Sequence, residues 1–274
     1  MSAPTRRAVV WVLAAALFCT AAANAARADE LYEAQAIVTG QREPERLRAL
    51  PDCLEDVLVK VSGDPRLIGD RRLLPLKANA ENFVASFRYH DRMAGLPVHD
   101  EQGTRDRPYD LIVSFDEAKT DAALRSLGLE PWKEPRPRLA LFAGVQNGPV
   151  PYVLTSDGER GLEQKLSLQA AAQKRGMSIV LPTASMLAAA GVRFDGLSAI
   201  GFERWGPIAK DAGGDTALIG TLFWIAAEFG WRADWRLVWQ GDHRWQIRGV
   251  TFDAAFRNAM EGSAQILSGH GEPK

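Results

Sequence analysis

The chain has 274 residues, of which 33 are lysine or arginine and 34 are aspartate or glutamate, for a formal net charge of −1. A near-neutral chain without a polycationic run lacks the basic patch by which proteins hold nucleic-acid phosphates, so no nucleic-acid partner is expected. The length is sufficient for one large domain or two small ones.

The N-terminus has the three parts of a secretory signal peptide. Arg6 and Arg7 come first, an alanine-rich apolar run follows, and Ala26 and Ala28 form a small-residue cleavage signal. We predict that residues 1–28 are cleaved and that the protein resides in the periplasm, with no transmembrane segment after cleavage. The leader takes three arginines and no acid, so the net charge falls from −1 to −4. The alternative is a leader retained as an anchor, because its apolar run approaches the ~20 residues that span a bilayer.

The first half of the mature chain, residues 29–130, is predicted to be an α+β unit. Alternation in "LYEAQAIVT" and the apolar run "YDLIVSF" favour strands, and Asp116 is a good N-cap for a helix that follows. The predicted elements are a strand at 31–39, a helix from Pro44 broken or restarted at Pro51, a helix at 77–89, a strand at 109–115 and a helix at 117–127.

Cys53 is the only cysteine left once the leader is removed, so no intramolecular disulfide is possible. Leu54, Val57 and Leu58 lie near it at helical spacing. We interpret Cys53 as a small buried hydrophobic residue of the helix. The alternatives are a nucleophile and an intermolecular disulfide bridge.

A polar loop from residue 91 to residue 108 is long for a structureless connection, and such loops are often functional or disordered. It carries the candidate binding residues His99, Asp100, Arg105 and Arg107. The functional hypothesis is a recognition loop for a partner or ligand, and the alternative is a solvated loop.

Residues 131–137 are proline-rich and are predicted to link the two halves. In residues 138–270, strands alternate with helices, which is typical of a sheet with helix-covered faces. The predicted elements are strands at 139–145, 177–182 and 217–226, helices at 159–174 and 198–212 with Ser198 as N-cap, the tryptophan segment, and a final helix at 252–267. The fold class expected for the whole chain is α/β with α+β character.

The tryptophan segment "GWRADWRLVWQGDHRWQIRG" begins at Gly230 and predicts a β-hairpin. Trp231, Trp235 and Trp239 alternate with arginine and aspartate, and a turn at 240–243 separates them from a second alternating run. The final helix is expected to cover the tryptophan face of this antiparallel hairpin within a mixed sheet. The alternative is an exposed platform on which the three rings stack a sugar, so they are also candidate binding residues.

The mature chain lacks the common sequence patterns of catalytic and metal sites. Its histidines lack the neighbours of common zinc sites, and no phosphate-binding glycine loop or nucleophile elbow is present. We therefore predict no catalytic residue, no metal and no cofactor.

Five stretches carry a resemblance to a known family, namely "LYEAQAIVTG", "EDVLVKVSGDPRL", "RPYDLIVSFD", "RGMSIVLP" and "ALIGTLF…GWRADWRLVW". Together with the leader they resemble a proteobacterial envelope family catalogued as domain-of-unknown-function family 2066. The likeness covers nearly all of the mature chain and implies a periplasmic location, but no activity, substrate or catalytic residue.

The expected function is that of a soluble periplasmic protein that works by binding, as an adaptor or accessory factor of the cell envelope. Its partner would be an envelope protein or a glycan. The alternatives are an envelope hydrolase acting on cell-wall or glycan material and a glycan-binding module.

Overall fold

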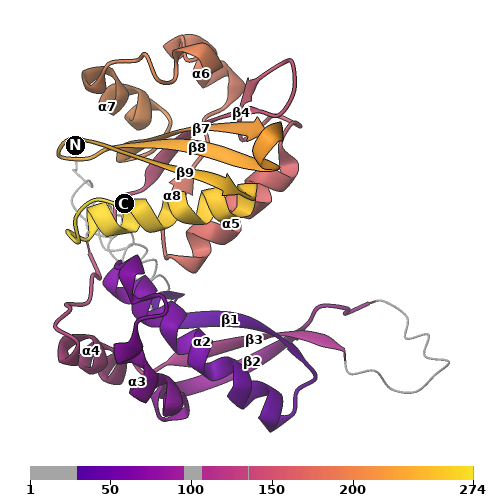
Figure 1. Ribbon diagram of the computed structural model, residues 1–274, viewed down its shortest axis with the longest axis vertical. Coiled ribbons are helices and arrows are strands. Elements are labelled where there is room, and N and C mark those ends of the chain that lie inside the picture. Colours follow the sequence, from indigo (N-terminus) through magenta and orange to yellow (C-terminus); the bar gives the residue numbers. More distant parts are fainter. Residues whose placement is uncertain (1–29, 96–106, 135, 274) are drawn as a thin grey trace, which may run out of the picture. The chain divides into compact units, whose positions relative to one another are not determined.

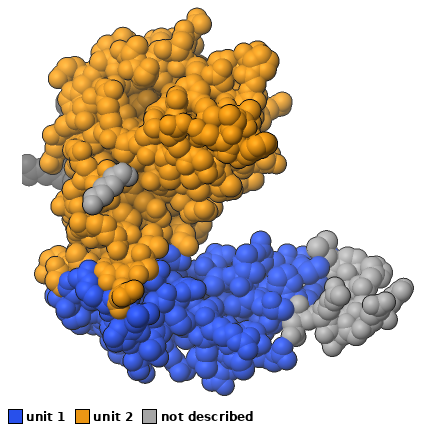
Figure 2. Space-filling model, viewed as in Figure 1, with its two compact units in different colours: residues 1–57, 72–127 blue, residues 58–71, 128–274 orange. Residues whose placement is uncertain are grey.

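The computed structural model of the protein describes residues 30–95, 107–134 and 136–273. These residues form two compact units (Figure 2). As far as it is described, unit 1 comprises residues 30–57 and 72–127, and unit 2 comprises residues 58–71 and 128–273. Helices and strands mix in both units, which confirms the α/β fold class with α+β character.

Unit 1 contains a three-stranded antiparallel sheet in the order β1-β3-β2 (Figure 1). Its core is formed by the buried face of this sheet and by apolar residues at helical spacing, such as Leu50, Leu54 and Val57. The elements are β1 (Glu33–Thr39), α2 (Glu43–Ser62, which ends in unit 2), α3 (Leu74–Ala78), β2 (Val84–Asp91), β3 (Pro108–Phe115) and α4 (Glu117–Ser126).

Two expectations for this part of the chain were correct. The Asp116 side chain accepts a hydrogen bond from the Lys119 amide at 2.9 Å and so caps α4 as predicted. Cys53 is 2 % exposed in α2, as expected for a buried small hydrophobe.

Two other expectations were wrong. The helix predicted at 77–89 ends early, because β2 begins at Val84 and pairs with the central strand β3, with His90 opposite Asp110. A short apolar run fits the helical and the strand period equally well. Here the backbone hydrogen bonds to β3 stabilise the strand. The break expected at Pro51 does not occur either, since α2 continues through it with Leu50 and Leu54 buried on both sides.

Unit 2 is a mixed sheet between two layers of helices (Figure 1). Helices α5 and α8 cover one face, and α6 and α7 cover the other. The sheet follows the order β5-β4-β7-β8-β9, and β6 pairs with the start of β4. The elements are β4 (Leu139–Gln146), β5 (Tyr152–Val153), α5 (Leu162–Lys174), β6 (Ile179–Val180), α6 (Ala184–Ala190), α7 (Phe202–Asp211), β7 (Thr216–Ile225), β8 (Gly230–Val238), β9 (Asp242–Val250) and α8 (Phe252–Leu267).

The central strand β4 is buried over nearly its whole length because helices cover both faces of the sheet. Leu139 and Leu141 point into the core under α5 and α8, whereas Ala140 and Phe142 point into the core under α6 and α7. Strand β7 is parallel to β4, and β8 and β9 complete the sheet as antiparallel strands.

The tryptophan segment forms the predicted hairpin of β8 and β9, and α8 covers its tryptophan face. The Trp235 ring lies 6.1 Å from Phe256, the Trp231 ring lies 6.4 Å from Phe252, and Trp245 Nε1 donates a hydrogen bond to the helix. The mixed sheet with a helix-covered antiparallel hairpin is therefore confirmed.

The helix predicted from Ser198 begins four residues later, at Phe202, with Gly201 at the N-cap. Ser198 is exposed in a turn where the amides of Ala199 and Ile200 both donate to the carbonyl of Gly196. Because these amides are satisfied within the turn, no serine cap is needed there. Sequence analysis also missed α6, a short helix capped by Thr183.

The proline-rich segment 131–137 is tied to the end of α2 within unit 2. The Trp132 amide donates to the carbonyl of Val61 at 2.8 Å, and the Arg136 guanidinium donates to the carbonyl of Lys60 at 2.7 Å. The Arg136 guanidinium also lies 4.0 Å over the Trp132 ring. These contacts fix Trp132 and Arg136 of this segment to residues 58–71.

Within the described ranges, no helix has both the length and the apolar character that a membrane span requires.

Candidate functional site

The candidate site lies at one edge of the unit 2 sheet, where the parallel strands β4 and β7 end (Figure 1). In open α/β sheets, ligands typically bind outside the carboxyl ends of parallel strands. Residues 147–151 connect β4 to β5 and form tip 1, and residues 226–229 connect β7 to β8 and form tip 2. We call this end of the sheet, with its two tips, the carboxyl edge.

Three side chains form a row across the strands at this edge. The strand register places Gln146 of β4 opposite Phe223 of β7, and Phe223 opposite Arg232 of β8. Directly opposed residues share a face of the sheet, so the amide, the ring and the guanidinium lie side by side. The Arg232 Cζ atom lies 4.7 Å from the centre of the Phe223 ring, and Arg232 Nε lies 3.3 Å from Asp234 Oδ2.

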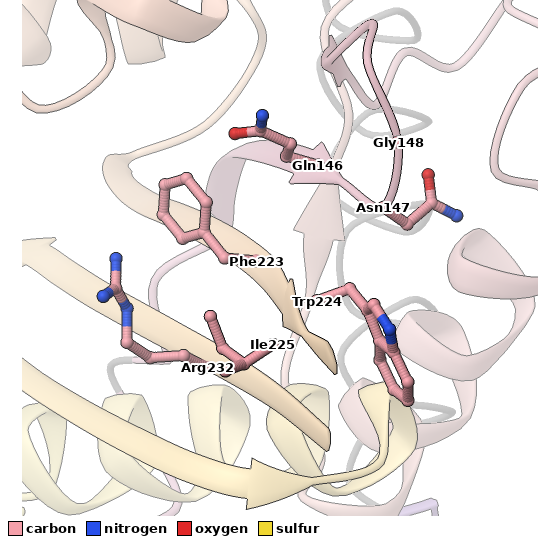
Figure 3. Close-up of a pocket in the computed structure, with 7 residues that line it drawn as sticks. All are labelled: Gln146, Asn147, Gly148, Phe223, Trp224, Ile225 and Arg232. Carbon is pink, nitrogen blue, oxygen red and sulfur yellow. The ribbon is translucent and has the colours of Figure 1, made fainter. Parts of the chain in front are cut away.

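A pocket of about 520 Å³ opens beside this row (Figure 3). Its volume falls within the roughly 300–1,000 Å³ of ordinary ligand sites, and its lining mixes aromatic, amide and guanidinium groups. Residues of tip 1 and of the ends of β4 and β7 line it together with one residue of β8. The lining residues are Gln146, Asn147, Gly148, Phe223, Trp224, Ile225 and Arg232.

Phe223 and Trp224 diverge from β7 because successive side chains of a strand point to opposite faces (Figure 3). The Trp224 ring is 42 % exposed and packs edge-to-face on Trp231, with ring centres 5.7 Å apart. The carboxyl edge therefore presents an aromatic ring on each face of the sheet.

Both tips expose large apolar side chains. Phe229 in tip 2 is 87 % exposed and Val150 in tip 1 is 63 % exposed. Leu162 and Leu166, in the first turns of α5 after tip 1, are exposed as well. Exposed apolar side chains gathered in one region are typical of interaction sites on soluble proteins.

Phe229 also adopts a left-handed backbone conformation, with φ of 47°. This conformation is uncommon for residues other than glycine and costs about 1–2 kcal/mol. Strained residues of this kind cluster at functional sites, where the surrounding structure maintains them. In this conformation the aromatic side chain of Phe229 is exposed to solvent.

Two arginines support the tips. The Arg160 guanidinium lies 4.0 Å over the Tyr152 ring and donates to the carbonyl of Val150 at 3.1 Å. Arg248 of β9 forms an ion pair with Glu228 of tip 2. The first contact fixes the base of tip 1, and the second balances the only charge in tip 2.

The structure buries the tryptophan rings of the predicted platform. Trp235 is 2 % exposed and Trp231 is 7 % exposed, so neither ring can offer a face to a ligand. Trp239 is partly buried at the hairpin turn and packs against the same core. The arginines that alternate with the tryptophans form ion pairs, for example Arg236 of β8 with Asp242 of β9 at 2.5 Å.

Most of the predicted recognition loop, including His99, Asp100 and Arg105, lies outside the described residues. Arg107 is described, and its guanidinium donates to Asp91 at 3.1 Å and to the carbonyl of Met93 at 3.2 Å. These bonds hold Arg107 to residues at the end of β2 and just after it, so in the described structure it supports the base of the loop.

A second polar cluster joins the end of α2 to the end of α8. Arg66 binds both carboxylate oxygens of Asp64 at 2.7 and 2.8 Å, and Ser268 Oγ lies 2.8 Å from His270 Nδ1. Burial raises the pKa of Asp64, but the hydrogen bonds from Arg66 outweigh it, so that the pKa lies below its ordinary value. Burial lowers the pKa of His270.

Although this cluster combines a serine, a histidine and an aspartate, its contacts indicate a structural role. The Ser268 hydroxyl lies within hydrogen-bonding distance of the carbonyls of Gly63 and Gln265, at 3.3 and 3.2 Å, and Asp64 is held by Arg66. The cluster closes the end of α8 over residues 63–66. Across the described part of the chain, no group of three His, Cys, Asp or Glu side chains is placed to hold a metal ion.

Sequence analysis missed the residues of the carboxyl edge. Trp224 was visible as a fifth tryptophan just upstream of the hairpin, but its exposure depends on where β7 ends. Phe229 carried a usable signal, since it is a bulky residue in a turn between two strands.

Comparison with known proteins gives one match. Residues 25–133 match a family model described as Domain of unknown function (DUF8605). Neither the curated proteins nor the solved structures gave a match. The matched stretch contains the sequence of unit 1 and ends before β4, so the carboxyl edge lies outside it.

Proposed function

We propose that the protein is a binding protein of the cell envelope, an adaptor or accessory factor, and that it holds its partner at the carboxyl edge of unit 2. The observation that carries the proposal is the exposure of Phe229 on a strained hairpin tip, at the same edge of the sheet as the exposed Val150 and Trp224. A side chain that stabilises no core and is held in solvent at a cost is best explained by a partner that covers it.

The proposed location is the periplasm. It is supported by the order of charged, apolar and small residues in the leader. The mass of the protein purified from the periplasmic fraction tests this point, and the expected chain begins at Asp29. A chain that keeps Met1 and stays with the membranes would favour the anchor alternative.

The likeness to the proteobacterial family 2066 belongs to the same proposal. Its motif "VKVSGDP" lies at the end of α2 and the start of the segment that closes over α8, so in this protein the motif has a packing role. We infer that such a shared motif marks a common scaffold rather than a common reaction.

Photo-cross-linking in cells tests the binding site. A photo-reactive phenylalanine analogue placed at Phe229 should form an adduct with a protein, glycan or lipid of the envelope. The same analogue at Leu74, which is 62 % exposed in unit 1, is the matched control. The proposal requires a specific adduct at position 229, and it is overturned if both positions give the same adducts or neither gives any.

A further inference from the structure

The two tips have the composition of segments that enter the interface of a lipid bilayer. Tip 1, "NGPVP", carries no charged residue, and tip 2, "AAEF", carries only Glu228. Because Arg248 pairs with Glu228, the tips present no uncompensated charge. Burying an unpaired charge in an apolar medium is costly, and both tips avoid this cost.

The backbone of the tips is also suited to a medium that offers few hydrogen-bond partners. Pro149 and Pro151 have no amide hydrogen, so tip 1 exposes fewer donors than an ordinary turn of its length. In tip 2, the Phe229 amide donates to the carbonyl of Ala226 at 3.3 Å. Unsatisfied backbone groups are what oppose insertion of a loop into lipid, whereas a protein partner could satisfy them.

Aromatic and basic side chains surround the tips as they do at membrane interfaces. Trp224 and Tyr152 flank them, and tryptophan and tyrosine favour the level of the lipid headgroups. Arg160, stacked on Tyr152, holds a guanidinium against the Val150 carbonyl, and a guanidinium beside an inserted residue can bind a lipid phosphate.

We propose that the carboxyl edge docks on the lipid surface of an envelope membrane, with Phe229 and Val150 inserted into the interface. The inference rests on the proposed binding function of this edge and names its partner as lipid. Docking of this kind needs no spanning helix, because two short apolar loops and nearby cations give reversible attachment.

Vesicle flotation tests the proposal with the exported protein as the cell processes it. The probes are vesicles of phosphatidylcholine alone and vesicles that also contain phosphatidylglycerol. The Val150→Ser/Phe229→Ser double variant should partition about tenfold more weakly than wild type, because two apolar side chains leave the interface. The Phe229→Trp variant should keep wild-type binding, because tryptophan also favours the interface.

The matched control is the Ile37→Ser/Leu74→Ser double variant. It removes two apolar side chains of similar exposure, 65 % and 62 %, from unit 1 and should bind vesicles as wild type does. The inference is overturned if the wild-type protein binds neither kind of vesicle, or if the two double variants bind equally well. If vesicles fail to bind while position 229 cross-links to a protein or glycan, lipid docking fails and the binding function stands.

Discussion

At the scale of single residues, Gly63 allows close packing because it has no side chain. It lies at the end of α2 with φ of 73°, and a Cβ atom there would lie 2.7 Å from both Ser268 Cβ and Trp132 Cε3. Only glycine permits the backbone to turn left-handed and the two side chains to close over it. The "VSGD" of the sequence is therefore a packing point as well as a helix stop.

We predict that Gly63→Ala destabilises the protein more than Gly69→Ala does. Gly69 has a similar φ of 71°, but a Cβ atom there would meet no other atom within 4 Å, so alanine should cost only the backbone strain, about 1–2 kcal/mol. Alanine at Gly63 adds an overlap with Ser268 and Trp132, for about 1–3 kcal/mol more. Urea denaturation of both variants measures the difference, and equal losses would contradict the packing argument.

His270 gives unit 2 a predictable sensitivity to acid. Its pKa in the folded protein lies below the ordinary value of 6.5, chiefly because of burial, so the unfolded chain takes up its proton first. Stability is therefore complete above pH 6.5 and falls as the pH drops from there through the lower folded pKa. Asp64 affects stability at lower pH. Its pKa in the folded protein is lowered from 3.8, so its stabilising contribution is present above pH 3.8 and is lost as the pH falls through the lower folded pKa.

The corresponding variant is His270→Gln. It should flatten the loss of thermal stability between about pH 7 and pH 5, because no imidazole remains to be protonated in a half-buried position. Thermal unfolding midpoints measured across this range check the expectation. A variant with the same pH dependence as wild type would show that another group dominates.

At the scale of elements, the β8–β9 hairpin was predictable and β2 was not. A strict period of two over many residues can be satisfied only by a strand with one buried face, and Trp231 and Trp235 do lie on that face. The stretch around Phe87 is too short to separate the two periods, and its pairing with β3 comes from residues about 20 positions away or more.

The candidate site was beyond sequence reasoning for a related reason. The row of Gln146, Phe223 and Arg232 exists because β4, which is distant in the sequence, pairs in parallel with the first strand of the consecutive pair β7 and β8. Alternation identifies which residues share a face within one strand, but it does not reveal which strands are neighbours. The rings of the alternative platform lie on the face that the final helix was expected to cover, and α8 does cover it.

Trp235 and Trp224 should respond oppositely to truncation. Trp235 is fully packed between α8 and the sheet, and a Cβ atom at Gly220 would overlap its ring. Trp235→Ala should therefore cost about 3–5 kcal/mol of unfolding free energy, whereas Trp224→Ala should stay within about 1 kcal/mol. Chemical denaturation compares the two, and a large loss at Trp224 would show that its role is structural rather than in binding.

At the scale of the whole molecule, the two units are interleaved along the chain. The chain enters unit 2 at Leu58, returns to unit 1 at Arg72 and enters unit 2 again at Gly128. The segment 58–71 contributes a turn, Pro65–Leu67, that packs against α8, and it receives the hydrogen bonds from Trp132 and Arg136. Unit 2 is therefore incomplete without residues that lie far before the rest of it in the sequence.

This arrangement predicts the behaviour of two fragments. A fragment of residues 58–274 keeps every contact of the 58–71 segment within unit 2 and should unfold cooperatively. A fragment of residues 128–274 loses the hydrogen-bond acceptors at Lys60, Val61 and Gly63 and should be clearly less stable. Thermal unfolding followed by circular dichroism compares them, and equal midpoints would contradict a structural role for the segment.

The hydrogen bond from Ser268 to the Gly63 carbonyl can form only late during synthesis of the chain. Its two residues are 205 positions apart, and a ribosome adding roughly 5–20 residues per second needs roughly 10–40 s to pass from one to the other. Throughout that interval the 58–71 segment is present without α8, against which it packs in the folded protein. The Gly63 carbonyl can accept this bond only after Ser268 has been synthesised, so the 58–71 segment reaches its final contacts late.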